Sequence, residues 1–145
     1  MTSVRQLLRT KPQGAITIAP KATIELALRL LAEKDIGALV VIEGEQVMGI
    51  FSERDYARKV FLTARSEEKT RVEEVMTRKV YYAHPDQSIN DVMTLMTTKH
   101  IRHLPVIENE KLLGVISIGD VVKTVIADHE FTIREMEKYI TGSLG

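Results

Sequence analysis

The pattern of apolar and polar positions along this chain occurs twice, and the two copies lie 65 positions apart. Pro20 in the first copy corresponds to Pro85 in the second, and each proline stops a short β-favouring run, residues 15–18 and 80–83. A proline ends a strand because it cannot donate a ladder hydrogen bond. A repeat of this length predicts one supersecondary unit used twice, in which each copy needs the other to bury its apolar face.

A helix is predicted after each of these strands. Thr23 and Ser88 are candidate N-caps, and the apolar residues that follow them recur at helical spacing. Each helix then has one apolar stripe that faces a core. The apolar positions are Ile24, Ala27, Leu28 and Leu31 in the first copy and Ile89, Val92, Met93 and Met96 in the second.

Two further apolar runs follow each helix, with a polar turn between them. The turn is residues 43–46 in the first copy and residues 108–111 in the second, so each pair of runs predicts a β-hairpin. A second helix is expected to begin near Asp55 and near Asp120. The repeated unit is therefore β-α-β-β-α, and the fold class is a mixed α+β fold with pseudo-twofold symmetry.

Other segments lie outside the repeated unit. Short amphipathic pieces, residues 4–8 and 72–76, precede the first strand of each copy at an offset of 68, and the polar segment 63–70 joins the copies. Residues 125–140 favour a long C-terminal helix, which we expect to end at Gly142. We assign residues 1–65 to the first repeat, 66–127 to the second, and 128–145 to a C-terminal helical extension.

Composition and charge narrow the function classes. Lys and Arg total 20, as do Asp and Glu, so the net charge is zero and no global basic field favours nucleic acid. The chain has no cysteine, which excludes disulfides and thiolate metal sites. No apolar stretch approaches the roughly 20 residues of a membrane-spanning helix, and we see no signal peptide. We expect a cytoplasmic protein that binds neither membrane nor nucleic acid.

The candidate chemistry begins with a serine and an aspartate three positions apart after each hairpin, Ser52 with Asp55 and Ser117 with Asp120. This spacing fits a capping box, in which serine and carboxylate satisfy the amides of a helix start. It also fits a ligand site, because a helix start presents amides and a hydroxyl to an anion while the carboxylate can accept ribose hydroxyls. Both interpretations stay open from spacing alone.

The second candidate is the entry to the middle strand of each copy. Gly37 and Ala38 leave room for a flat ring, whereas Arg102 and His103 supply donors for phosphate oxygens. Arg102 and His103 could equally be exposed loop residues. The ligand interpretation gains weight from the further cations Arg54, Arg58 and Lys59.

Taken in order and repeated, these motifs identify a resemblance to the cystathionine β-synthase (CBS) domain pair, or Bateman module. The resemblance covers residues 4 to about 126, and the Ser-Glu-Arg-Asp run at 52–55 is similar to small stand-alone bacterial pairs and their plant organellar relatives. The residues that carry it are Val75-Met76-Thr77, Ile101-Arg102-His103-Leu104-Pro105-Val106-Ile107, Gly49-Ile50-Phe51-Ser52-Glu53-Arg54-Asp55, and Gly114-Val115-Ile116-Ser117-Ile118-Gly119-Asp120.

The resemblance implies two clefts between the repeats that bind adenosine nucleotides, with the aspartate on the ribose and serine and basic residues on phosphate. It implies one cleft with Ser117 and Asp120 beside Ile16, Thr17, Ile36, Gly37, Ala38, His103 and Val115. It implies a second cleft with Ser52, Arg54 and Asp55 beside Ile50, Val80, Tyr81, Ile101, Arg102 and His103. Because Gly37-Ala38 and Arg102-His103 differ, we expect the two clefts to bind unequally.

The function expected is a sensor that binds AMP, ADP, ATP or NAD as a ligand and regulates an enzyme or redox protein in trans. The alternatives are a structural dimerisation module without ligand and a nucleotide-modifying enzyme. The enzyme class is disfavoured because no second group positions Asp55, Asp120 or His103 as a general base. The histidines lack tight ligand spacing, so no metal site is expected. We also expect a homodimer to which the C-terminal helix contributes.

Overall fold

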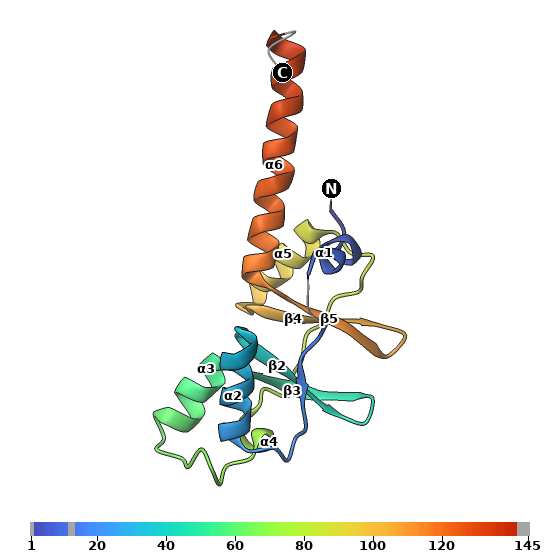
Figure 1. The fold of residues 1–145 in the computed structure, drawn as a ribbon. Coiled ribbons are helices and arrows are strands. Elements are labelled where there is room, and N and C mark those ends of the chain that lie inside the picture. The colour runs from blue at the N-terminus through green and yellow to red at the C-terminus, as the bar shows by residue number, and fades with distance from the viewer. Residues whose placement is uncertain (1, 12–13, 142–145) are drawn as a thin grey trace.

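The structure is a computed structural model that describes residues 2–11 and 14–141 (Figure 1). Both copies of the repeat fold into separate sheets and helices that stack one on the other, with the two hairpins next to each other in the middle (Figure 1). The first repeat contains β1 (Thr17–Ile18), α2 (Ile24–Lys34), β2 (Ala38–Glu43), β3 (Gln46–Ser52), α3 (Glu53–Tyr56) and a π-helical turn at Ala57–Phe61. The second contains α5 (Ile89–Lys99), β4 (His103–Glu108), β5 (Lys111–Ser117) and α6 (Ile118–Thr141).

The predicted helix starts and hairpins are confirmed. Thr23 accepts a hydrogen bond from the Leu26 amide at 3.2 Å, and Ser88 accepts one from the Asp91 amide at 3.1 Å. Both hairpins have two-residue turns, because Glu43 pairs with Gln46 and Glu108 with Lys111. Each also has an irregularity at the same place in its register. The two repeats are therefore alike in local detail.

The prediction of a first strand in the second copy has to be corrected. Residues 80–83 were predicted as a strand, but they form none, and Ala83 makes one parallel bridge to Val106. In the first copy the Val40 amide donates to the Ile16 carbonyl at 3.3 Å. The position equivalent to Val40 is Pro105, which has no amide hydrogen and cannot make this bond. One sheet consequently has the order β1-β2-β3, and the other is the pair β4-β5.

Each short amphipathic helix packs against the other repeat, which the sequence did not reveal. The helix α1 (Val4–Thr10) places Val4 and Leu7 in the core of the second repeat, whereas α4 (Val72–Val75) places Val72 and Val75 in the core of the first. Backbone hydrogen bonds fix both helices in equivalent places, for example from Val4 to the Gln87 carbonyl at 2.9 Å. The two repeats are thus joined by more than the contact of their sheets.

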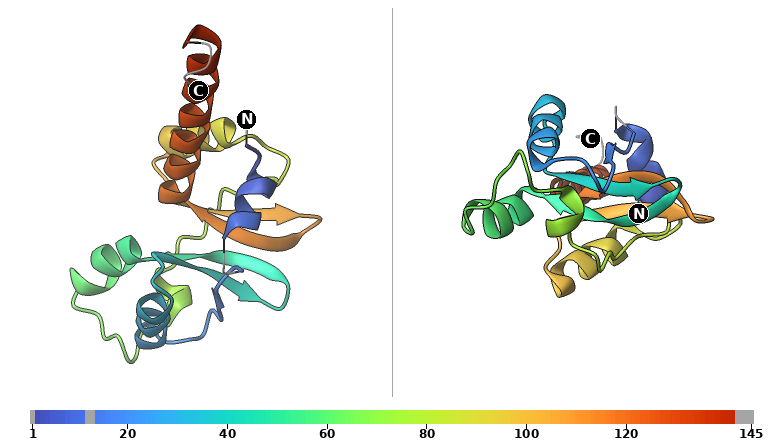
Figure 2. Two further views of the ribbon diagram at one scale, coloured as in Figure 1. Left: turned by 45° about the horizontal axis from the view of Figure 1, so that its top comes forward. Right: turned by 90° about the horizontal axis from the view of Figure 1, so that it is seen from below.

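The second helix of each copy differs in length. In the first copy α3 is four residues long and passes into the π-helical turn, where Val60 is buried. In the second copy the expected helix near Asp120 and the expected C-terminal helix are one continuous helix, α6. It extends well beyond the body of the molecule (Figures 1 and 2). The expected stop at Gly142 lies outside the described residues.

Candidate functional site

Two cavities lie between the repeats, and each contains one of the two Ser/Asp pairs. The Asp55 cleft has a volume of about 800 Å³ and the Asp120 cleft a volume of about 460 Å³. Gly37 and His103 line both, so they form the wall that separates the cavities. Because of this shared wall, Gly37, which was predicted for the Asp120 cleft, also lines the Asp55 cleft.

The structure brings nearly all the predicted residues to these cavities. The Asp120 cleft is lined by Ile16, Ile36, Gly37, Ala38, His103, Val115, Ser117 and Asp120, and the Asp55 cleft by Ile50, Ser52, Arg54, Asp55, Val80, Tyr81, Ile101, Arg102 and His103. The exception is Thr17, which is exposed in β1 and lines neither cavity. Strand alternation accounts for this, because neighbouring residues in a strand point to opposite faces.

In the Asp55 cleft the carboxylate is held from several sides. The Ser52 amide donates to Asp55 Oδ2 at 3.0 Å, and the Asp55 amide donates to Ser52 Oγ at 3.2 Å, which completes a capping box. The hydroxyl of Thr77 donates to Asp55 Oδ1 at 2.9 Å, and Lys59 Nζ lies 2.9 Å from the same oxygen. Asp55 is 7% exposed, so this carboxylate is buried but fully partnered.

In the Asp120 cleft the same box has a different outer partner. The Ser117 amide donates to Asp120 Oδ2 at 2.8 Å, and the Asp120 amide donates to Ser117 Oγ at 3.1 Å. The ammonium of Lys11 donates to Asp120 Oδ2 at 2.7 Å and to the Val115 carbonyl at 2.6 Å. Partial burial opposes ionisation of Asp120, but the Lys11 and Ser117 hydrogen bonds outweigh it and lower the pKa of this carboxyl.

His103 sits against the bare backbone of Gly37. A methyl group at Gly37 would lie 2.9 Å from His103 Nε2, so the glycine makes room for the imidazole. Burial lowers the pKa of His103, and the nearby charges of Lys11 and Arg102 lower it further, while Asp120 opposes them. His103 is therefore neutral at pH 7 and can accept a hydrogen bond in either cleft.

The sequence missed several lining residues. Lys11 and Lys34 line the Asp120 cleft, and Thr77 and Lys79 line the Asp55 cleft. A signal for Lys11 and Lys79 was present, because each follows its amphipathic piece at the same offset of 68. Lys79 also lies 5.5 Å from the centre of the Tyr81 ring. Tyr81 is half-buried and packs against the second core, so it is part of the wall as well as the packing.

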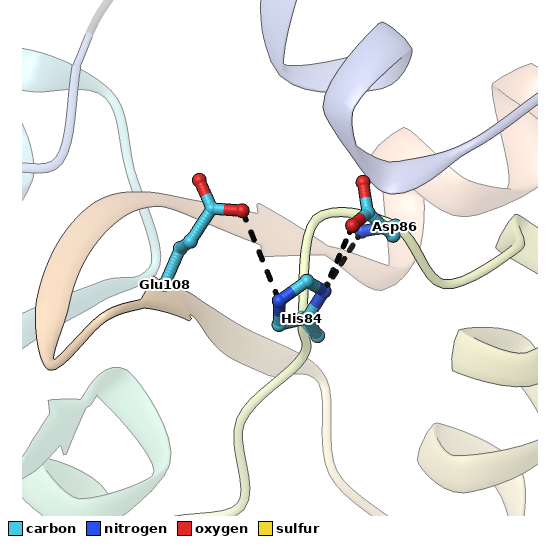
Figure 3. A group of neighbouring side chains, drawn as sticks. All are labelled: His84, Asp86 and Glu108. Carbon is cyan, nitrogen blue, oxygen red and sulfur yellow. Dashed lines mark hydrogen bonds and ion pairs between the residues drawn. The ribbon is translucent and has the colours of Figure 1, made fainter.

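A separate polar cluster lies beside α1, where the structure brings together His84, Asp86 and Glu108 (Figure 3). Their potential ligand atoms lie within 4.8 Å of one another. Arg5 donates to Asp86 at 3.1 Å and to Glu108 at 2.8 Å, while the Asp86 amide donates to His84 Nδ1 at 3.1 Å. The cluster is thus an ion-pair network that attaches α1 to the second repeat.

Comparison with known proteins identifies the family. The CBS domain model matches residues 4–61 and 72–127. The chain belongs to the CBS domain family. It is 34% identical over 150 residues to the mitochondrial CBS domain-containing protein CBSX3 of Arabidopsis thaliana, covering 97% of this chain and 73% of that protein. The expected tandem CBS pair, similar to small stand-alone bacterial proteins, is confirmed.

Solved structures show the same fold. A putative signal-transduction protein with CBS domains from Burkholderia ambifaria is 52% identical with a TM-score of 0.84, covering 88% of this chain and 96% of that one. The CBS pair of protein MJ0100, in complex with 5′-methylthioadenosine and S-adenosyl-L-methionine, is 26% identical with a TM-score of 0.78, covering 88% and 98%. A hexameric CBS-CP12 protein from bloom-forming cyanobacteria is 27% identical with a TM-score of 0.75, covering 99% and 90%. Among these neighbours, the MJ0100 pair thus holds adenosyl compounds and the CBS-CP12 protein is a hexamer.

No helix within the described residues has the length and apolarity needed to cross a bilayer.

Proposed function

We propose that this protein is a regulatory module that binds adenosine nucleotides in its two clefts and controls a partner protein in trans. The observation that carries the proposal is the pair of cavities between the repeats, each with a Ser/Asp box on its wall. The MJ0100 pair, which holds two adenosyl compounds, supports an adenosyl ligand here. AMP, ADP, ATP and NAD all carry that adenosine.

The carboxylates are the proposed ribose contacts. Asp55 Oδ1 faces Thr77 and Lys59, and Asp120 Oδ2 faces Lys11, so each carboxylate already accepts hydrogen bonds from side chains at its cleft. A pair of ribose hydroxyls supplies two donors of the same kind. Binding exchanges protein donors for ligand donors, which keeps the buried oxygens satisfied. The capping box that the structure shows is compatible with this role, because it uses the serine and the backbone amides.

We propose that the module has no catalytic activity of its own. Asp55, Asp120 and His103 are the titratable candidates, and the two carboxylates are each engaged with a lysine in the structure. A general base is oriented by a second group, and within the described residues no hydrogen bond holds the His103 ring in place. Incubation with ATP or NAD should therefore yield no product, while unfolding of the purified protein should release an adenosine nucleotide. We place this regulatory module in the cytoplasm.

We further propose a homodimer, in which α6 contributes to the contact. Its outer part carries large exposed apolar side chains, among them Ile126, Ile133 and Met136 at helical spacing. A second copy of the chain would cover them. Equilibrium sedimentation at micromolar concentration should give twice the monomer mass of 16.4 kDa, and a 16.4 kDa species would contradict the dimer.

Calorimetry with AMP and GMP tests the ligand class. Adenosine nucleotides should give saturable heats, and guanosine nucleotides should give none. Equal heats for AMP and GMP, or no heat with any adenosine compound, would contradict the proposed function. If adenosine nucleotides bind, the regulated partner can be sought by its effect on their affinity, since ligand binding and partner binding must influence each other reciprocally.

A further inference from the structure

The two clefts differ strongly in the charge of their walls. Five cationic side chains and two carboxylates line the Asp55 cleft. Their charges sum to +3, without counting the two histidines of this cleft. Two cations and two carboxylates line the Asp120 cleft among the described residues, which leaves zero. The cations of the Asp55 cleft are Arg54, Arg58, Lys59, Lys79 and Arg102, and its carboxylates are Glu53 and Asp55.

Most of the cations in the Asp55 cleft are not neutralised by the protein. Lys59 pairs with Asp55 and also donates to the Val75 carbonyl at 3.0 Å. Within residues 2–11 and 14–141, the other four cations of this cleft form no ion pair. In the Asp120 cleft, by contrast, Lys11 is committed to Asp120 at 2.7 Å. One cavity therefore concentrates unpaired positive charge and the other does not.

The unpaired cations belong to both repeats. Arg54 and Arg58 follow β3 in the first repeat, while Arg102 directly precedes β4 in the second. Side chains of like charge around one cavity repel each other, and a multiply charged anion among them converts that repulsion into attraction. Guanidinium groups suit phosphate oxygens in particular, because their planar donors can bind two oxygens at once. A chain of phosphates could reach both repeats, whereas a single phosphate has fewer oxygens to share.

We infer that the Asp55 cleft selects adenosine compounds with a chain of two or more phosphates, and that the Asp120 cleft selects adenosyl compounds with little negative charge. This inference rests on the proposed function, since both clefts are taken to hold adenosine. Cavity size agrees with the division, at about 800 Å³ for the cationic cleft and about 460 Å³ for the neutral one. Arg54 and Arg102 then act as specificity residues that read the phosphate chain.

The test compares ATP, AMP and adenosine by calorimetry on the full chain at one fixed salt concentration. The test variant is R54Q/R102Q, and the matched control is K34Q, which removes a cation from the Asp120 cleft alone. Arg54, Arg102 and Lys34 are all exposed, so none of these changes empties a core position. Circular dichroism melting checks that all three proteins fold alike.

The parent should bind ATP more tightly than AMP at one site per chain, the Asp55 cleft. It should bind adenosine at a second site, the Asp120 cleft, from which ATP does not displace it. R54Q/R102Q should weaken ATP binding by about 10- to 100-fold, through the loss of charged hydrogen bonds, and change adenosine binding by less than about 3-fold. K34Q should leave the ATP affinity within about 2-fold of the parent.

Two results would overturn the inference while leaving the proposed function intact. They are competition of ATP and adenosine for the same site with equal affinity, and an ATP affinity that R54Q/R102Q does not change or that K34Q lowers as much. A parent that binds none of the three compounds would overturn the proposed function and the inference together. Higher salt should weaken ATP binding much more than adenosine binding, because screening acts on the charged contacts.

Discussion

The Asp55 and Asp120 clefts begin from the same serine and aspartate but surround the aspartate with different partners. Asp55 is 7% exposed and contacts Thr77 and Lys59, while Asp120 is half-buried and contacts Lys11. The capping box is the duplicated part, and the outer partners come from segments before the first strand or from the following helix. A duplicated motif therefore repeats a local structure, while its surroundings decide the electrostatics of each site.

The largest difference between the clefts should appear when each aspartate is replaced by alanine. Asp55→Ala and Asp120→Ala should each weaken the binding of adenosine compounds in their own cleft by about 10- to 150-fold, through lost charged hydrogen bonds. Asp55→Ala should also lower the free energy of unfolding by about 1 to 3 kcal/mol, because it leaves Thr77 and Lys59 without their acceptor. Asp120→Ala should lower it by about 1 kcal/mol, the usual effect of a lost cap.

Affinity and melting temperature must be measured on both variants, with 2′-deoxy and 3′-deoxy AMP as controls for the ribose contact. The outcome that decides against the ribose role is a variant that folds less stably yet binds AMP like the parent. In that case the Ser/Asp pair of that cleft is a helix cap alone.

The second comparison concerns the two short amphipathic helices, at the equivalent glycines Gly49 and Gly114. A methyl group at Gly49 would lie 2.7 Å from the Thr77 carbonyl oxygen, whereas one at Gly114 would lie 2.8 Å from the tip of Leu8. Backbone cannot yield as a flexible side chain can. Gly49→Ala should therefore lower the free energy of unfolding by about 1 to 3 kcal/mol, and Gly114→Ala by under about 1 kcal/mol. Chemical denaturation of both variants checks this order, and equal losses would argue against the close approach at Thr77.

The smallest effect is the pH response of His103 in the wall between the clefts. Its pKa is lowered from 6.5 in the folded protein, mainly by burial, so the unfolded chain binds a proton more readily. Stability from the neutral imidazole is present above pH 6.5 and is lost as the pH falls from there toward the folded pKa. Denaturation at pH 7.5 and pH 5.5 should show a larger loss for the parent than for His103→Gln. A loss of the same size in both proteins would rule out His103 as the titrating group.

Much of the fold was predictable because it depends on neighbours in the sequence. Thr23 and Ser88 cap helices whose apolar stripes face the cores, and the polar turns close two hairpins. The prediction of a first strand in the second copy, at residues 80–83, was wrong, although these residues favour β-structure. The reason lies in the neighbouring strand β4, because Pro105 lacks the amide hydrogen that Val40 donates to the Ile16 carbonyl in the first copy.

The sequence by itself determined the duplicated unit and the spacing of the two Ser/Asp pairs, since each follows from positions along neighbouring elements. The cleft residues were implied by the resemblance to the CBS pair, and all of them except Thr17 line the two cavities. The tertiary structure decided which charges meet. It placed Lys11 on Asp120, Thr77 and Lys59 on Asp55, and α1 on the second repeat. Contacts between distant segments depend on how the helices cross and pack, and no local periodicity encodes that packing. The difference in charge between the two clefts is therefore a property of the folded chain.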